Sequence, residues 1–214
     1  MNIVTIPSDL LQSNMYLVVE GSHALIIDPW VTELPESFRN VTIDRIYVTH
    51  EHIDHISGVN YWKEKSGAPF ICSKKCASGC ENSKKNLSSY IEVFWELQTW
   101  VENAKIPQIG EYEAKADKVF EGNYKDNWNG HMIEIIECPG HSSGSSVILI
   151  DSEYLFSGDC LFRDYPTATN IPGGSRKDWF DNSEVILRSM GDNVNVYPGH
   201  FQSFQLNSYR FWSK

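Results

Sequence analysis

Short apolar runs separated by turn residues dominate the N-terminal part of the chain. Alternating or continuous apolar positions predict β-strands over residues 2–7, 14–20 and 23–28, with Gly21-Ser22 as a hairpin turn between the last two. Residues 43–49 (Ile-Asp-Arg-Ile-Tyr-Val-Thr) are typical of a buried strand. A helix over about 55–65, ending at Ser66-Gly67, and a strand at 69–71 follow, so this part predicts a β-α-β crossover unit.

The pattern is less regular from residue 72 to residue 118. Helical spacing of its apolar positions predicts an amphipathic helix from Leu87 to about Asn103, within a partly helical insertion at about 72–118. The stretch 87–112 is rich in aromatic residues. Packing on the core is its simplest role, and a lid or pocket wall, or a contact between two copies of the chain, are the alternatives.

Strand patterns return in the second half, at 119–122, 132–137, 146–150, 154–157 and 194–197, and a helix is predicted over about 177–190. Each half therefore contains strands, then polar motifs, then a helix. This arrangement predicts an α/β fold in which two packed halves share one cleft. A length of 214 residues favours a single domain over 1–214.

Charge and hydropathy exclude several classes of protein. The net charge is −10, and no Lys/Arg tract is longer than a pair, so a nucleic-acid partner is not expected. No apolar run approaches the ~20 residues of a membrane span, and the N-terminus has no secretory pattern. We therefore expect a cytoplasmic protein with no membrane partner, present as a monomer or a homodimer. Three of its five cysteines, Cys72, Cys76 and Cys80, are spaced four apart, and a metal or redox role for them stays open.

The densest chemistry lies in Thr49-His50-Glu51-His52-Ile53-Asp54-His55. His50, His52 and Asp54 alternate, so in an extended backbone their side chains leave on one face. Protonated imidazoles crowded in this way would repel one another. A dication removes that conflict, because it binds neutral imidazole and ionised carboxylate.

Three later motifs place polar residues at predicted strand ends. They are Pro139-Gly140-His141, Gly158-Asp159 and Pro198-Gly199-His200. Asp28 also ends a strand, and we expect it to accept hydrogen bonds from loop backbone or from a metal-binding side chain. His23 and His131 lack such a context and are interpreted as ordinary surface residues.

The ordered series resembles the metallo-β-lactamase superfamily, and its surrounding words resemble the glyoxalase II-like (hydroxyacylglutathione hydrolase-like) branch. Those words are Thr-His-Glu-His-Ile-Asp-His, Pro-Gly-His-Ser-Ser-Gly-Ser, Ser-Gly-Asp-Cys-Leu-Phe and Tyr-Pro-Gly-His. The resemblance implies a four-layer αββα sandwich, with two mixed β-sheets flanked by helices. It also implies two divalent metal ions, zinc in the first instance, with iron or manganese as alternatives. The implied ligands are His50, His52 and His141 for one ion, Asp54, His55 and His200 for the other, and Asp159 between them.

The activity that this resemblance implies is hydrolysis of a small-molecule ester or thioester by a hydroxide that bridges the metals. Asp54 would accept and relay the proton as the catalytic residue. Glutathione recognition of the glyoxalase II type is not expected, since only Arg210 and Lys214 are cationic after His200. An arginine typical of short relatives is also missing before Pro172-Gly173-Gly174. Arg163 and Tyr165 are nearby candidates for substrate binding.

Three other functions compete with this one. A persulfide dioxygenase would bind one iron through His50, His141 and Asp159. A lactonase or phosphodiesterase of the same superfamily would use the same metals. A non-enzymatic, metal-stabilised binding module is the third alternative, although all seven implied ligand positions are intact.

Overall fold

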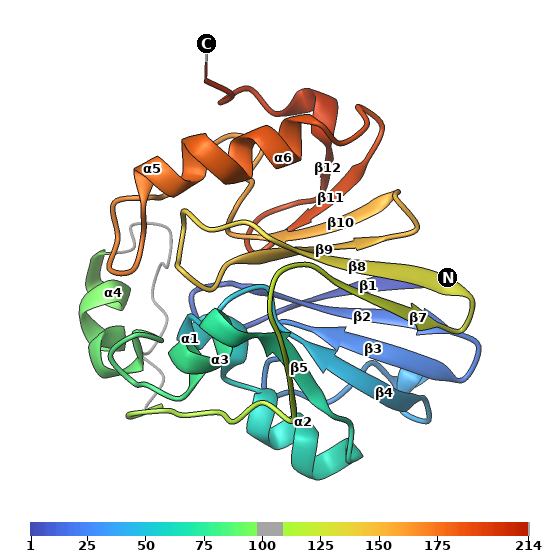
Figure 1. Ribbon diagram of the computed structural model, residues 1–214. Coiled ribbons are helices and arrows are strands. Elements are labelled where there is room, and N and C mark those ends of the chain that lie inside the picture. Colours follow the sequence, from blue (N-terminus) through green and yellow to red (C-terminus); the bar gives the residue numbers. More distant parts are fainter. Residues whose placement is uncertain (98–108, 214) are drawn as a thin grey trace.

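Two six-stranded β-sheets that face each other form the centre of the molecule (Figure 1). The computed structural model describes residues 1–97 and 109–213. The first sheet has the order β1-β2-β3-β4-β5-β6. Its strands are β1 (Asn2–Pro7), β2 (Asn14–Glu20), β3 (His23–Ile27), β4 (Thr42–Tyr47), β5 (Phe70–Ser73) and β6 (Lys118–Phe120). The second sheet has the order β12-β11-β10-β9-β8-β7. Its strands are β7 (Tyr124–Trp128), β8 (His131–Glu137), β9 (Ser146–Ile150), β10 (Tyr154–Gly158), β11 (Asn195–Pro198) and β12 (Phe204–Gln205).

Both sheets are mixed. In the first, β1, β2 and β3 pair antiparallel, and β3, β4, β5 and β6 pair parallel. In the second, β10 and β11 are parallel and the other pairs are antiparallel. The chain direction in β8 is therefore the same as in β10 and β11, which brings the ends of these three strands to one edge.

The apolar runs of β2, β3 and β9 are continuous because both faces of each strand are buried. In β2, Leu17 faces the outer core of the first sheet, whereas Tyr16 and Val18 face the second sheet. In β9, Leu149 faces the outer core of the second sheet and Ile148 faces inward. Three apolar layers result, one between the sheets and one outside each of them.

Helices close the two outer layers (Figure 1). The first sheet is covered by α1 (Ile53–Ile56), α2 (Val59–Ser66) and α3 (Lys74–Cys80). The second is covered by one continuous helical stretch made of α5 (Arg176–Asp178), the π-helical η3 (Trp179–Ser183) and α6 (Glu184–Arg188). Short 3₁₀ turns occur at η1 (Glu36–Phe38) and η4 (Leu206–Ser208). The predicted αββα sandwich is thus confirmed. Among the described residues, no helix is long and apolar enough to cross a bilayer.

The helix predicted over 55–65 is instead two helices that meet at Gly58. At Gly58 an added Cβ would lie 2.6 Å from the carbonyl carbon of Trp30, so the chain here packs directly on neighbouring backbone. The break lets α1 carry the polar motif and α2 cover the sheet.

Two of the strands, β7 and β12, were not predicted from the sequence. β7 is mostly polar and β12 has only two residues, and both are edge strands, which carry a weak apolar signal.

The predicted 87–103 helix is present in part, as η2 (Ser88–Tyr90) and α4 (Ile91–Leu97), and its remainder lies outside the described residues. In this stretch, Trp95 and Tyr112 pack on the outer core of the first sheet, which confirms the core role for these two aromatic residues.

The three cysteines spaced four apart do not share one helix face. Cys72 lies in β5, and only Cys76 and Cys80 lie on α3, with their sulfur atoms 3.8 Å apart. All three are buried free thiols. Hydrogen bonds from Cys76 and Cys80 lower the pKa of Cys72 to about 5. A functional role for these thiols stays a prediction.

Candidate metal centre

The C-terminal ends of four strands from both sheets meet at one edge of the sandwich. The loop after β4 carries His50 and His52, and the loop after β8 carries His141. Asp159 directly follows β10, and His200 follows β11. This placement follows from the common direction of the strands, since their C-terminal ends meet at the same edge.

Backbone and side-chain hydrogen bonds tie the two sheets together at this edge. The Ser146 N–H donates to the Thr49 carbonyl at 2.8 Å. The Asn14 N–H donates to the Gly199 carbonyl at 2.7 Å, and the Asn14 side chain donates to the Pro198 carbonyl at 3.0 Å. The Tyr16 hydroxyl donates to that same carbonyl at 2.6 Å. The loop that carries His200 is therefore held by β2 of the opposite sheet.

Three histidine nitrogens converge in a first group. His50 Nε2 and His141 Nε2 each lie 3.0 Å from His52 Nδ1, and all three side chains are buried. Their ligand atoms meet the geometric requirement for a shared metal ion. His52 thus presents Nδ1 to this group, whereas His50 and His141 present Nε2.

A second group combines a carboxylate with two histidines. Asp54 Oδ2 lies 3.4 Å from His55 Nε2 and 3.3 Å from His200 Nε2. These three residues also have the spacing of a metal-binding set.

The Asp159 carboxylate lies between the two groups. Its Oδ2 is 3.4 Å from His141 Nε2 and 3.6 Å from His200 Nε2, and its Oδ1 is 3.4 Å from His55 Nε2. One side chain therefore contacts members of both groups. The structure brings all seven predicted ligand residues into one buried cluster.

A chain of hydrogen bonds behind the cluster orients the imidazoles. His55 Nδ1 donates to Asp28 Oδ2 at 2.9 Å, so its Nε2 faces the cluster and can present a lone pair to a metal ion. Thr49 donates to Asp28 through its N–H at 2.6 Å and its hydroxyl at 2.7 Å, and that hydroxyl lies 3.0 Å from His50 Nδ1. His141 Nδ1 lies 3.1 Å from the Ala168 carbonyl. The prediction that Asp28 would accept such bonds is confirmed.

Burial keeps the first histidine group neutral. Loss of hydration, together with the neighbouring His55 and His52, holds the pKa of His50 well below its ordinary value. Burial, with the nearby His141, lowers the pKa of His52 to about 3. Burial also lowers the pKa of His141. Neutral imidazole is the form that binds a metal ion.

In the second group, the effect of neighbouring charges on the pKa values outweighs the effect of burial. Burial alone would raise the pKa of Asp54, but His55 and His200 lower it well below its usual value. Burial would also raise the pKa of Asp159, but His200, His55 and His141 lower it. Burial would lower the pKa of His55 and of His200, yet the facing carboxylates raise both. Without a cation, the two carboxylates thus draw protons onto these histidines.

Unpaired buried atoms inside the cluster fit a metal ion. His55 Nε2 and Asp159 Oδ1 are buried, have no hydrogen-bond partner and face each other. An orphaned polar atom is costly in a protein interior. A divalent cation would satisfy both atoms, and nitrogen-rich and carboxylate-containing sets suit zinc, iron or manganese.

Glu51 is an acid of this motif to which no role was assigned from the sequence. Its buried carboxylate accepts hydrogen bonds from the Ser142 hydroxyl at 2.7 Å and from the Gly144 N–H at 3.3 Å. Burial raises its pKa. Glu51 therefore joins the His50–His52 loop to the loop that follows His141. An acidic residue between two metal-binding histidines was the available signal.

The remaining predicted residues lie in different surroundings. Tyr165 lines a cavity above the cluster, but Arg163 is not part of that wall, and its guanidinium lies 2.8 Å from the Asp164 carboxylate. His23 pairs with Asp44, and His131 pairs with Asp151, both away from the cluster.

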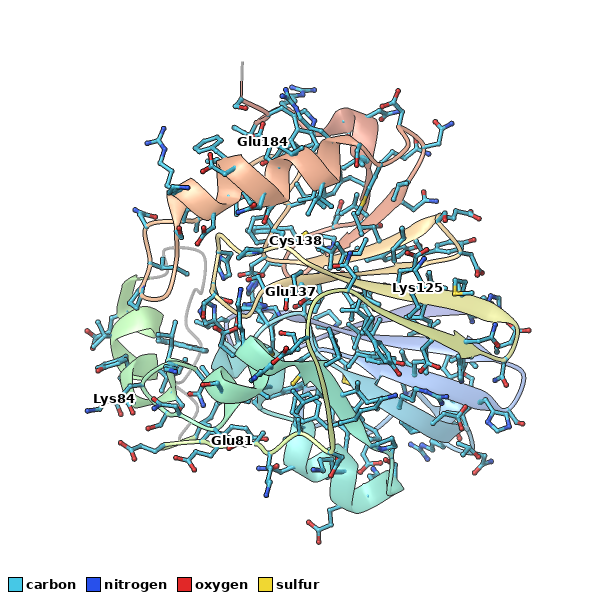
Figure 2. The ribbon with its side chains drawn as sticks, viewed as in Figure 1. Glu81, Lys84, Lys125, Glu137, Cys138 and Glu184 are labelled. Carbon is cyan, nitrogen blue, oxygen red and sulfur yellow. The ribbon has the colours of Figure 1, made fainter. Side chains whose placement is uncertain are left out.

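Cys160 packs in the outer core of the second sheet and donates to the Cys138 carbonyl at 3.6 Å. Figure 2 shows Cys138 beneath the helix formed by α5 and α6. The Cys160 thiol therefore points away from the metal ligands.

Residues 8–200 match the profile of the metallo-beta-lactamase superfamily, and the chain belongs to this family. An uncharacterized protein, Rv2581c of Mycobacterium tuberculosis, is 26% identical over 98% of this chain and 95% of its own length. "Probable metallo-hydrolase YqgX" of Bacillus subtilis is 27% identical over 91% of this chain and 84% of its own length. A hydroxyacylglutathione hydrolase of Brucella ovis is 28% identical over 86% of this chain but only 57% of its own length.

Solved structures agree on the fold. The BLEG-1 B3 metallo-beta-lactamase has a TM-score of 0.77 at 23% identity, with 97% of this chain and 95% of that chain covered. TTHA1623 in a di-iron-bound form has a TM-score of 0.70 at 25% identity, with 97% and 96% covered.

Proposed function

We propose that this protein is a binuclear metallohydrolase that cleaves an ester or thioester bond of a small molecule. The observation that carries the proposal is the position of Asp159. Its two carboxylate oxygens face histidines of both metal-binding groups, which is the arrangement expected of a ligand shared by two ions. The names of two relatives, a metallo-hydrolase and a hydroxyacylglutathione hydrolase, support hydrolysis as the reaction class. The di-iron-bound structural relative supports a centre of two ions.

The metal pair would supply a hydroxide near neutral pH and polarise the carbonyl oxygen of the substrate. Net hydrolysis adds the oxygen of water to the carbonyl carbon and breaks the C–S or C–O bond. The products are a carboxylate and a thiol or an alcohol, and one proton is released.

The chain's own residues have defined parts in this scheme. Asp28 holds His55 with its Nε2 toward the cluster, and Asp54 stays ionised because His55 and His200 lower its pKa. Asp54 lines the floor of the cavity above the cluster, where it can accept a proton from the attacking water and pass it to the leaving group.

Metal analysis combined with turnover tests this function. We expect the purified protein to bind about two metal ions per chain. We also expect it to hydrolyse a simple acyl thioester, and His52→Ala to abolish this turnover. Gly191→Ala is the matched control, because an added Cβ at this glycine meets no atom within 4 Å.

One iron per chain with oxygen uptake on a persulfide would overturn the proposal in favour of the dioxygenase. Failure of the metal-loaded protein on thioesters, lactones and phosphodiesters alike would favour a binding module.

A further inference from the structure

A cavity of about 260 Å³ opens directly above the metal-binding cluster. Its floor contains His52, Asp54, His141, Asp159 and His200. Its walls are almost entirely apolar and come from five separate segments of the chain. The wall residues are Leu11, Ile53, Leu87, Ile91, Phe162, Tyr165, Pro166, Ala168, Ile171 and Phe201.

Positive charge is missing from these walls. Within the described residues, no lysine or arginine lines the cavity. Arg163 lies in a neighbouring depression that shares Tyr165 and Phe201, and there its exposed guanidinium pairs with the Asp164 carboxylate at 2.8 Å. A site that binds an anionic group normally offers it Arg, Lys or a cluster of N–H donors. An anionic portion of a substrate would find no such partner in this wall.

Three of the apolar wall residues have left-handed backbone conformations. The φ angles are +53° at Leu11, +68° at Leu87 and +67° at Phe201. This region is unfavourable for bulky side chains. Such strain persists where the surrounding structure imposes it, and it gathers at functional sites.

Hydrogen bonds hold the chain at or beside each strained residue. Beside Leu11, the Ser13 hydroxyl donates to the Asp54 carbonyl at 2.7 Å. Beside Leu87, the Ile53 N–H donates to the Asn86 carbonyl at 2.8 Å.

At Phe201, the carbonyl accepts from the Asn14 side chain at 2.9 Å. The two loops at Leu11 and Leu87 are thus anchored to α1, which carries ligand residues, and the third adjoins His200.

Aromatic rings form the wall nearest His200. Phe201 stacks on Tyr165 with ring centroids 5.2 Å apart and meets Phe162 edge-on at 5.7 Å. The Phe162 ring lies 6.0 Å from the imidazole of His200. Phe201 is nevertheless 46% exposed, so part of its ring faces the open side of the molecule. An exposed and strained aromatic residue directly beside a metal-binding histidine favours a role in substrate binding.

We propose that this wall is a subsite for an uncharged, apolar acyl group, and that Leu11, Leu87 and Phe201 determine its specificity. The inference rests on the proposed hydrolase function, since it places the acyl side of the scissile carbonyl in the cavity and the carbonyl over the metal ligands. Acyl groups with a carboxylate or a phosphate are excluded by the uncharged wall. The leaving group extends toward solvent.

A chain-length series tests this assignment on the metal-loaded protein. The substrates are acyl thioesters of N-acetylcysteamine from acetyl to octanoyl, with succinyl as the anionic counterpart. We expect kcat/KM to rise about threefold to fourfold per methylene until the cavity is filled. We expect succinyl to be poorer than butyryl by at least tenfold. A flat series, or a preference for succinyl, would overturn the subsite.

Variants locate the effect in the wall. Phe201→Gly removes the ring and relieves the backbone strain, so the fold should be retained. It should lower kcat/KM for the hexanoyl thioester about tenfold and for the acetyl thioester less than twofold. Val185→Ala removes an exposed apolar side chain that is not part of the cavity wall, and it should change neither value. Equal losses on both substrates with Phe201→Gly would contradict the specificity role.

Binding without turnover separates this inference from the function on which it rests. Linear carboxylates from acetate to octanoate are titrated calorimetrically into the metal-loaded protein. If no thioester is hydrolysed, the proposed function fails, but affinity that increases with chain length still supports the apolar subsite. Affinity that is independent of chain length overturns it.

Discussion

Asp28 connects two histidines of the cluster without belonging to it. The carboxylate accepts from His55 Nδ1 and from both donors of Thr49, whose hydroxyl in turn faces His50. Its left-handed backbone, with φ of +53°, is one that aspartate and asparagine tolerate better than other residues. A strand-ending Asp is visible in the sequence, but its partners are set by a loop 21 to 27 residues further along the chain.

Asp28→Asn should therefore weaken metal binding while the fold is retained. The amide tolerates the same backbone conformation but presents one acceptor oxygen in place of two, so His55 loses part of its orientation. Loss of such a partner typically costs 10- to 100-fold in metal affinity. Titration against a competing chelator measures this loss.

Asp44→Asn is the matched control, because Asp44 also pairs with a histidine, His23, at 2.9 Å but away from the cluster. Equal affinity losses in both variants would contradict the positioning role of Asp28.

The metal-binding cluster leaves no room for a side chain at Gly199. An added Cβ would lie 2.1 Å from Asp159 Oδ1 and 2.8 Å from His55 Cε1. Gly199→Ala should displace one of these ligands and reduce the bound metal to about one ion per chain or less, as measured by elemental analysis. Gly191→Ala has open space at its Cβ and should keep the metal content of the unmodified protein. Two tightly bound ions in Gly199→Ala would show that the ligands do not have this geometry.

At the scale of elements, the Asp126 carboxylate of β7 makes polar contacts with β4 of the opposite sheet. Asp126 accepts from Arg45 Nε at 2.8 Å and from the Tyr47 hydroxyl at 2.9 Å. Burial would raise the pKa of Asp126, but the hydrogen bonds from Tyr47 and Arg45 lower it. A carboxylate whose pKa is lower in the folded state stabilises the fold above its ordinary pKa, and this contribution is lost as the pH falls through the folded value.

Asp126→Asn should lower the free energy of unfolding at pH 7 by about 1–2 kcal/mol. The difference from the unmodified protein should begin to shrink below about pH 4, where the Asp126 carboxylate of the unfolded chain starts to bind a proton, and should be lost once the pH has fallen below the lower folded-state pKa. Urea unfolding at a series of pH values measures both effects.

Glu134→Gln is the control on the same sheet, since its partner Lys125 is largely exposed. It should change stability by no more than about 0.5 kcal/mol. A pH-independent loss in Asp126→Asn would contradict the ionic origin.

The sequence predicted those elements whose pattern is strong. Strands β2, β3 and β9 have unbroken apolar runs because both faces are buried, and the motif residues follow directly after strands. The polar edge strand β7 has no such run, and the break between α1 and α2 depends on contact of Gly58 with a distant segment. Features that depend on tertiary packing of this kind produce no apolar periodicity in the local sequence, so the sequence does not predict them.

The metal-binding cluster was likewise predicted only in part from the sequence. The spacing of His50, His52 and Asp54 indicated a metal site, but the grouping of the ligands was implied by a family resemblance and not by the spacing itself. The cavity wall could not be predicted, because Leu11, Leu87 and Phe201 are brought together only by the meeting of distant loops. Arg163 was expected to bind substrate, but it is not part of that wall, and its guanidinium pairs with Asp164.

At the scale of the whole molecule, the metal centre joins the two halves of the sandwich. Each group combines ligands from the loop after β4 or from α1, on the side of the first sheet, with a histidine that follows β8 or β11 of the second sheet, and Asp159 follows β10. Bound ions would therefore cross-link the two sheets at this edge. Without them, the buried atoms His55 Nε2 and Asp159 Oδ1 lack partners, and the carboxylates and histidines must share protons in the interior.

Removal of metal should consequently lower the stability of the entire chain and not of one loop. Ligands that bind only the folded state stabilise it by RT ln(1 + [L]/Kd), which is about 4 kcal/mol at a thousandfold excess over Kd. We expect dialysis against a chelator to lower Tm by about 10 °C or more in one cooperative transition, and added zinc to restore it. Scanning calorimetry measures both. His52→Ala, which removes a ligand from the first group, should show a smaller chelator-induced shift. An unchanged Tm after verified removal of the metal would mean that the ligand cluster is stable without its ions, and that the two halves are joined by their apolar core alone.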